Sequence, residues 1–364
     1  MKGGYQGYGE AGHAHLFSGA KRDGSPLPGM TVSALLARDA FLAADVGGTY
    51  ARIGLIAFRS NEHAPTVLAY RVYKCAEHAD LESIVRVFCD ELNVRPDRLV
   101  LACAGFLHDG VVVNSKLRWP VAPGSLAKNL GFQSVHVLND FEALAYGTSY
   151  LDASNVKTLH RPENNEEARG PVVIVGPGTG LGVAVRFPDA RPAVLATEAG
   201  HIQLAARTGR EQQVLSELAP ANTHVPYDEV LSGPGLLRLY RALCRLEKLP
   251  AVFQEPAAIT AAASAGSNVR AVEALQMFCG WLGSYVGDLA MLYGATGGIY
   301  IAGGFFSQIS EFVEKSSFVA RFLDKGVVRP FLQTVPVHVV EHAQLGVIGA
   351  ACWMRDRCMQ EKSA

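Results

Sequence analysis

The sequence lacks an excess of charge of either sign. Its 33 lysine and arginine residues almost balance 34 aspartate and glutamate residues, which leaves a formal net charge of −1 at pH 7. Binding to nucleic acid or to an anionic membrane surface needs clustered lysine and arginine, because both partners present arrays of phosphate. The composition therefore predicts no nucleic acid partner and indicates a protein that recognises a small molecule.

Long apolar runs are also missing. The longest uncharged runs lie around residues 171–185 and 289–309, and glycine or proline interrupts both of them. A membrane-spanning helix needs about 20 consecutive apolar residues. We therefore expect no membrane partner. The chain also begins without a basic segment followed by an apolar core, so we expect no secretory signal.

Cysteine is scarce, and the seven cysteines are dispersed without a Cys-x-x-Cys pair. An odd number of scattered cysteines is typical of a reduced protein in which the thiols serve for packing. This pattern predicts a cytoplasmic location. It also excludes a structural zinc site of the clustered Cys/His type.

The composition that remains is that of a compact α/β enzyme: 49% of the residues are apolar, 18% are charged and 37 are glycine. A length of 364 residues is sufficient for two domains. Residues 1–40 show no apolar periodicity, and we expect a disordered leader there. The polar stretch 152–170 predicts a linker. We place a small α/β domain at 41–150 plus 343–364 and a large one at 151–342.

Two long segments have the 3.6-residue periodicity of helices. Residues 81–92 place their apolar side chains on one face, and residues 269–293 do the same over a greater length. Gly280, Gly283 and Gly287 fall within the longer segment, where glycine disfavours a helix, so we expect them to permit close packing. The chain is expected to close with a strand at 335–343 and a helix at 345–357.

The first of three glycine-rich turns joins two predicted strands within residues 41–58. Glycine lets backbone amides converge on an anion, so Gly47, Gly48 and the hydroxyl of Thr49 can bind phosphate. A Gly-Gly pair between strands can equally be an ordinary hairpin turn. Asp45, just before the turn, is either a turn residue or a carboxylate that holds Mg²⁺ through water.

The second turn, within residues 171–187, repeats this design with Gly178, Thr179 and Gly180 between two strand patterns. The repetition predicts two halves of related architecture. A nicotinamide dinucleotide fingerprint is not expected, because that motif requires a helix directly after its glycines. The third turn, Gly303-Gly304, ends a short strand and can pass close under an adenine and a ribose.

A strand pattern gives way to a helix pattern at Asp140. The β-branched run from Val135 ends in Asn139 and Asp140, and helical periodicity follows from Phe141. Catalytic side chains in open α/β sheets favour the carboxyl ends of strands. Asp140 is therefore a candidate general base beside a phosphate donor. The alternative is that Asp140 only caps the helix that begins at Phe141, since aspartate favours the N-cap position.

Three further polar residues are candidates for binding a polyol. Glu198 and His201 lie three residues apart in a turn that contains Gly200, which makes a metal-binding helix a poor interpretation of the pair. A hydrogen-bonding clamp for sugar hydroxyls fits better. Glu229 precedes a Ser-Gly-Pro-Gly helix start, and it is either a third sugar ligand or a solvated loop charge.

Six segments, in this order and spacing, resemble the bacterial glucokinase family: ADVGGTYAR, VLNDFEALAYG, GPGTGLGVA, TEAGHIQ, YDEVLSGPGLLRLYRAL and IYIAGGFF. The resemblance covers roughly residues 41–357. It implies the actin-like ATPase fold, with two ribonuclease-H-like domains and an interdomain cleft that closes over ATP and sugar. It also implies a magnesium-dependent transfer of phosphate from ATP to glucose at the entry to glycolysis, and a homodimer.

The resemblance also implies a role for each candidate residue. Asp140 becomes the general base, and the sugar ligands are Asn139, Asp140, Glu198, His201 and Glu229. The ATP-binding residues are Asp45, Gly47, Gly48, Thr49, Gly178, Thr179, Gly180, Gly303 and Gly304. One departure is visible, because Tyr50 stands where the family commonly has asparagine. We expect this change to alter the affinity for ATP and not to abolish activity.

Three other readings remain. The nearest is a kinase for another hexose or for an amino sugar. A sugar-binding regulator without turnover is the second, although such a protein has no need of a base at Asp140. A nicotinamide oxidoreductase is the third, and it is opposed because we expect no helix directly after any of the glycine turns.

Overall fold

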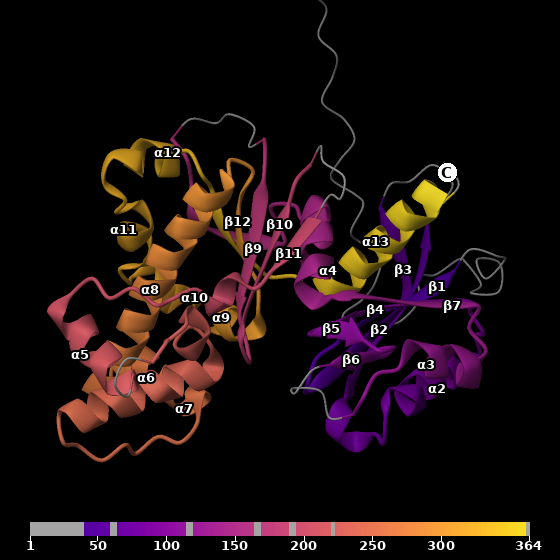
Figure 1. Ribbon diagram of the computed structural model, residues 1–364, viewed down its shortest axis with the longest axis horizontal. Helices are drawn as coiled ribbons and strands as arrows, with labels where there is room; N and C mark the ends of the chain where they lie inside the picture. Colours follow the sequence, from indigo (N-terminus) through magenta and orange to yellow (C-terminus); the bar gives the residue numbers. More distant parts are fainter. Residues whose placement is uncertain are drawn as a thin grey trace, which may run out of the picture. The chain divides into compact units, whose positions relative to one another are not determined.

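The structure is a computed structural model that describes residues 40–58, 64–113, 119–163, 169–188, 194–219 and 223–361 (Figure 1). Contacts divide the chain into two units. The first unit comprises Met1–Leu101 and Phe106–Val137, and the second comprises Ala102–Gly105 and Leu138–Ala364. The expected disordered leader lies outside the described residues, apart from its last residue, Ala40.

The first unit is built on a five-stranded sheet of order β3-β2-β1-β4-β7. Its strands are β1 (Phe41–Val46), β2 (Tyr50–Phe58), β3 (Pro65–Lys74), β4 (Arg98–Cys103) and β7 (Ser134–Asn139), and a small hairpin is formed by β5 (Phe106–His108) and β6 (Val111–Val113). The helices are α2 (Leu81–Leu92) and α3 (Pro123–Leu130), with the 3-10 turn η1 (Cys75–Glu77). Helix α2 begins where predicted because Asp80 and Ser83 form a capping box at its N-terminus.

The second unit is built on a six-stranded sheet of order β11-β10-β9-β12-β13-β8. Its strands are β8 (Val156–His160), β9 (Val172–Pro177), β10 (Leu181–Arg186), β11 (Val194–Thr197), β12 (Gly298–Ile301) and β13 (Val337–Val340). Strands β9 and β10 are antiparallel, whereas β12 is parallel to both β9 and β13.

Helices cover both faces of this second sheet (Figure 1). Its helices are α4 (Asp140–Gly147), α5 (Gly209–Leu218), α6 (Gly233–Leu246), α7 (Pro256–Ser264), α8 (Val269–Tyr293), α9 (Gly304–Gln308), α10 (Ser310–Glu314), α11 (Phe318–Leu323), α12 (Arg329–Gln333) and α13 (Leu345–Glu361), with short 3-10 turns η2 (Thr148–Tyr150), η3 (Ala199–His201), η4 (Tyr227–Glu229) and η5 (Gly326–Val328). Along β9, Val173 and Val175 belong to the core under α6 and α8, whereas Ile174 belongs to the cluster under α4 and α13. The continuous apolar run of β9 therefore reflects burial on both faces.

The predicted repetition of architecture is confirmed at the level of strand order. Each sheet contains five strands in the same spatial order. The first three strands in the chain lie in reverse order, and the fourth and fifth follow them: β3-β2-β1-β4-β7 in one sheet and β11-β10-β9-β12-β13 in the other. In both, a glycine-rich turn joins the first antiparallel pair of strands. Mixed α/β architecture with two sheets is therefore shown.

The long helix α8 has the bounds that its periodicity predicted. Its glycines do permit close packing: a Cβ on Gly283 would overlap the carbonyl oxygen of Phe318, and one on Gly287 would lie 2.8 Å from that of Phe322. Helix α11 therefore approaches α8 more closely than side chains would allow. The propensity lost to glycine inside α8 is offset by this packing.

The grouping of two helices differs from the expected domain division. We expected residues up to 150 and the segment 343–364 to belong to the small domain, but contacts group α4 and α13 with the second unit. The reason is the crossing of these two helices, since a Cβ on Gly349 would overlap the carbonyl oxygen of Ala143. A Cβ on Gly147 would likewise lie 2.6 Å from the Leu345 side chain.

All seven cysteines lie within the described residues and all are free thiols; six are buried, and Cys358 is partly exposed. This agrees with the prediction that they serve for packing. Among the described residues, no helix is long and apolar enough to cross a membrane.

Candidate functional site

The second glycine turn, between β9 and β10, is where the candidate residues of the second unit meet. The turn is closed by the amide of Gly178, which donates to the carbonyl oxygen of Gly180 at 2.8 Å. Two contacts hold it from outside. The amide of Gly233 donates to the carbonyl oxygen of Gly178 at 2.8 Å, and Asp228 Oδ1 accepts from the amide of Leu181 at 2.5 Å.

The third glycine turn lies directly beside the second. The amide of Ala302 donates to the carbonyl oxygen of Val175 at 2.8 Å, which brings the ends of the parallel strands β12 and β9 together. Gly303 has φ +119°, and a Cβ there would lie 2.9 Å from the carbonyl oxygen of Pro177. Only glycine fits this position. A helix, α9, begins at Gly304, so the expectation that no helix follows any of the turns is wrong for the third turn.

Asp140 is the first residue of α4, and Asn139 caps the helix. The side chain of Asn139 accepts hydrogen bonds from the amides of Phe141 at 2.9 Å and Glu142 at 3.2 Å. Asp140 Oδ1 also accepts from the amide of Phe141, at 3.0 Å. Asn139 therefore holds the N-cap position, and Asp140 shares the amide of Phe141 with it, so a part of the expected capping role of Asp140 is retained.

Phe141 fixes the start of α4 to the sheet. Gly176 and Gly182 face each other across β9 and β10, and the Phe141 ring lies over both: a Cβ on Gly176 would be 2.6 Å from the ring, and one on Gly182 would overlap it. The ring thus packs beside the second glycine turn. The sequence analysis did not predict this packing of the Phe141 ring. The only local signal for it is the presence of glycine within strands, which indicates close approach of another group.

Glu198 and His201 belong to the turn around η3. His201 Nε2 lies 3.9 Å from Glu198 Oε2, and the two side chains are 64% and 89% exposed, respectively. A Cβ on Gly200 would overlap the carbonyl oxygen of Leu181. The absence of a side chain at Gly200 therefore lets this turn lie against the residue that ends the second glycine turn.

Glu229 lies in η4, and backbone hydrogen bonds join that turn to the Glu198–His201 region. The amide of Tyr227 donates to the carbonyl oxygen of Ile202 at 3.0 Å, and a bridge links Gln203 to Pro226. The Glu229 carboxylate forms an ion pair with Arg238 at 2.6 Å, and both side chains are partly exposed. Backbone contacts therefore join the two turns that carry the predicted sugar ligands Glu198, His201 and Glu229. The pairing with Arg238 was not predicted.

The first glycine turn belongs to the first unit and is held by Cys75. The amide of Cys75 donates to the carbonyl oxygen of Thr49 at 2.9 Å, and its thiol donates to that of Gly47 at 3.4 Å. The turn is closed by the amide of Gly47, which donates to the carbonyl oxygen of Tyr50 at 3.0 Å. The Tyr50 side chain is 39% exposed. A cysteine separated from the turn by two strands, β2 and β3, thus fixes its shape.

Asp45 faces Arg52 on the neighbouring strand. Arg52 Nη1 lies 3.3 Å from Asp45 Oδ2, and its guanidinium lies 5.9 Å from the centre of the Tyr50 ring. Burial raises the pKa of the Asp45 carboxyl, and the Arg52 charge opposes that rise. Asp45 is therefore not only a turn residue; it forms part of an electrostatic pair beside the first glycine turn.

No cluster of three or more His, Cys, Asp or Glu side chains suited to a metal ion occurs among the residues that the structure describes. Mg²⁺ in nucleotide enzymes is usually held by one or two carboxylates, and water and substrate phosphates complete its coordination. Asp45 can supply such a carboxylate.

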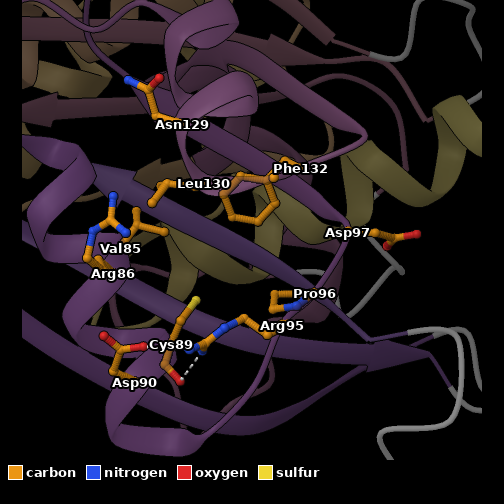
Figure 2. Close-up of a pocket in the computed structure, with 11 residues that line it drawn as sticks. Val85, Arg86, Cys89, Asp90, Arg95, Pro96, Asp97, Asn129, Leu130 and Phe132 are labelled. Atoms are coloured by element: carbon orange, nitrogen blue, oxygen red, sulfur yellow. Dashed lines mark hydrogen bonds and ion pairs between the residues drawn. The ribbon is translucent and has the colours of Figure 1, made fainter.

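A separate hollow of about 180 Å³ lies in the first unit between α2, α3 and the segment before β4 (Figure 2). Its lining includes Cys89, Arg95, Asn129 and Phe132, and none of the predicted site residues. Both lining arginines are already paired, Arg95 with Asp90 at 2.8 Å and Arg86 with Glu82 at 2.8 Å. The hollow therefore offers no unpaired arginine charge for a phosphate.

Two mixed α/β sheets of the same strand order, each with a glycine turn on its first hairpin, match the fold of sugar kinases of known structure. The sequence model of the glucokinase family matches residues 42–357, and the chain belongs to this family.

Known proteins agree with this assignment. The chain is 43% identical over 316 residues to a glucokinase-like protein of Xylella fastidiosa (strain 9a5c), a match that covers 86% of this chain and 94% of the relative. A solved glucokinase from an Antarctic psychrotroph is 34% identical, with a TM-score of 0.76 over 87% of this chain and 99% of the other. A ROK family glucokinase from Streptomyces griseus, solved with glucose and AMPPNP, is 20% identical, with a TM-score of 0.59 over 87% and 99% of the two chains. This last likeness shows the fold alone.

Proposed function

We propose that the protein transfers the γ-phosphoryl group of ATP to the 6-hydroxyl of glucose. The observation that carries the proposal is the convergence on the second glycine turn. Asp228, one residue before Glu229, holds the amide of Leu181, and the turn that contains Glu198 and His201 lies against the carbonyl oxygen of the same residue. Candidate sugar ligands and a candidate phosphate turn are thus parts of one local assembly.

Asp140 is the proposed general base. A sugar hydroxyl is a weak nucleophile, so the site must align it with the phosphoryl group and accept its proton as the new bond forms. The packing of Phe141 against β9 and β10 fixes the helix start that carries Asp140. Asn139 holds the N-cap position and accepts the amides of Phe141 and Glu142, while Asp140 shares only that of Phe141.

The proposed sugar ligands combine donors and acceptors. Glu198 and Glu229 accept hydrogen bonds from hydroxyls, whereas His201 and the Asn139 amide nitrogen can donate them. An epimer that leaves one of these groups unpaired is penalised, which gives the site its selectivity. Glu229 must exchange its ion pair with Arg238 for a sugar hydroxyl, or share it between the two.

The proposed nucleotide ligands are the three glycine turns. Gly47, Gly48 and Thr49 in the first turn and Gly178, Thr179 and Gly180 in the second offer amide and hydroxyl donors to phosphate. Gly303 and Gly304 leave room for the adenosine. Asp45 would hold Mg²⁺ through water, and the bound ion would neutralise the charge on the phosphate oxygens.

We also propose an architecture for each unit, a cellular location, a metabolic role and an assembly. Both halves have the strand order expected of ribonuclease-H-like domains, and we infer that architecture for each. The free, mostly buried cysteines support a cytoplasmic location. The resemblance to glucokinases supports a role at the entry to glycolysis and a homodimeric assembly.

An assay of ADP release over a panel of hexoses and amino sugars, with and without magnesium, tests the proposal. We expect magnesium-dependent turnover with the highest kcat/KM for glucose. A higher kcat/KM for another sugar would replace glucose as the substrate. Binding of glucose without ADP release from any sugar would favour the regulator.

A further inference from the structure

We propose that Asp228 is a positioning residue that couples hexose binding to the shape of the second phosphate turn. The inference rests on the proposed function, because it takes Glu229 as a sugar ligand and the turn at Gly178–Gly180 as a phosphate ligand. Asp228 lies next to Glu229 in the 3-10 turn η4, and its Oδ1 accepts the amide of Leu181 at 2.5 Å. The short turn η4 therefore carries both a proposed sugar ligand, Glu229, and the residue that holds the phosphate turn, Asp228.

The segment 228–233 contacts both ends of the phosphate turn. At the far end, Asp228 holds Leu181, the first residue of β10. At the near end, the amide of Gly233 donates to the carbonyl oxygen of Gly178 at 2.8 Å. The segment 228–233 thus contacts the residues that flank Thr179 and Gly180, and it limits where their donors can point.

Hydrogen bonds within the segment 228–233 join its two ends, so a displacement at one end is transmitted to the other. The Ser232 hydroxyl donates to the carbonyl oxygen of Asp228 at 2.9 Å and accepts from the amide of Gly235 at 3.0 Å, which caps α6. Ser232 is buried, with 1% of its surface exposed. A Cβ on Gly235 would lie 2.5 Å from the carbonyl oxygen of Val230, so the helix start is also closely packed against the residue that follows η4.

The position of η4 depends on what Glu229 binds. In this structure Glu229 pairs with Arg238 of α6 at 2.6 Å. A hexose that takes the Glu229 carboxylate acts on the backbone one residue from Asp228, and through it on the amide of Leu181. Hexose binding is therefore expected to order the phosphate turn and to strengthen nucleotide binding, and the same coupling must act in reverse.

The test compares Asp228→Ala with Asp228→Asn and with the control Asp152→Ala. Asp152 also accepts a backbone amide, that of Ser154 at 2.7 Å, but it is exposed and lies in a turn before β8. The measurements are kcat, the KM for each substrate, the Kd of glucose alone, and the Kd of a non-hydrolysable ATP analogue with and without glucose.

For Asp228→Ala we expect the KM for ATP to rise about tenfold, a value within the usual range of coupling between sites, while the Kd for glucose changes less than about twofold. The strengthening of analogue binding by glucose should be lost. Asp228→Asn should recover part of it, because the amide oxygen still accepts the Leu181 hydrogen bond. Asp152→Ala should behave as the unsubstituted protein does.

A second measurement needs no variant. Hydrogen exchange of the Leu181 amide in the full chain should slow when glucose is added. An unchanged exchange rate, or an Asp228→Ala protein that keeps the coupling of the control, would overturn the inference. These results differ from failure of the proposed function, which would appear as an absence of hexose phosphorylation in the unsubstituted protein.

Discussion

At the scale of single residues, Asn139 and Asp140 have similar side chains and separate tasks. Asn139 accepts the amides of Phe141 and Glu142 and so completes the first turn of α4. An N-cap of this kind contributes roughly 1 kcal/mol to stability. Asp140 Oδ1 shares the amide of Phe141, and an asparagine at this position keeps an oxygen that can accept it, so the substitution Asp140→Asn should leave the helix intact.

The substitution Asp140→Asn tests the proposed base. We expect kcat to fall by about two to four powers of ten, with a smaller change in the KM for glucose, because proton acceptance belongs to the transition state. The thermal midpoint should stay near that of the unsubstituted protein. Steady-state kinetics and thermal unfolding on the same preparation check both expectations.

Asn139→Asp is the matched variant. Aspartate caps a helix about as well as asparagine, so stability should be retained while the donor proposed for a sugar hydroxyl is lost. We expect a higher KM for glucose and a smaller effect on kcat than that of Asp140→Asn. Normal turnover of a folded Asp140→Asn protein would contradict the assignment of the base.

At the scale of elements, the start of α4 is determined by what lies beneath it. The Phe141 ring occupies the space left by Gly176 and Gly182, which face each other across β9 and β10. Helix α13 holds the other side of α4 through the close approach of Gly349 to Ala143. Contacts on two sides therefore hold this helix of eight residues in place. The intrinsic helix propensity of so short a segment would not be sufficient to stabilise it.

Gly182→Ala should disturb this arrangement. Its methyl group would overlap the Phe141 ring, and overpacking of this kind costs typically 1–3 kcal/mol. We expect a lower free energy of unfolding together with a reduced kcat. Urea unfolding and turnover, measured side by side, check the prediction.

The double variant Gly182→Ala with Phe141→Leu makes that test specific, because the smaller leucine leaves room for the methyl group. The two substitutions should be non-additive, as expected for residues in contact. Gly209→Ala, at the start of α5 where a Cβ meets nothing within 4 Å, serves as the control. Additive effects would show that the ring and the glycine act independently.

At the scale of the whole molecule, three histidines near one edge of the second sheet make stability depend on pH. Burial lowers the pKa of His160, of His338 and of His342 below the ordinary value of 6.5, and the charge of Arg161 lowers the pKa of His338 further. The folded state therefore binds fewer protons than the unfolded state below pH 6.5. Stability is present above that pH and is lost as the pH falls toward the lower folded-state pKa values.

We expect the urea midpoint to fall between pH 7 and pH 5. Each histidine contributes at most about 1.4 kcal/mol per pH unit within this window. His338→Gln should reduce the pH dependence, because glutamine cannot be protonated and can retain a hydrogen bond to Thr158, which lies 3.1 Å from His338 Nδ1. His108→Gln, at an exposed position, is the control and should leave the dependence unchanged.

What the sequence determined by itself is the set of local structures. The 3.6-residue periods of α2 and α8, the hairpins around the glycine turns and the change from strand to helix at Asn139–Asp140 all depend on neighbours within a few residues. The candidate site residues were recognised in the same way, because turn chemistry and spacing are local. Asn139 was predicted as a sugar ligand but not as the cap, since the two adjacent polar residues are equivalent in pattern.

Only the tertiary structure decided how these pieces are held. Asp228 lies 47 residues beyond the amide that it accepts, Phe141 packs on glycines of two later strands, and Gly349 brings α13 onto α4 and into the second unit. The physical reason is that each of these contacts exists only when distant segments are brought together. A hydrogen-bond acceptor, a ring and a missing Cβ have no specific partner until the sheet has formed, and no local period records which partner each will have.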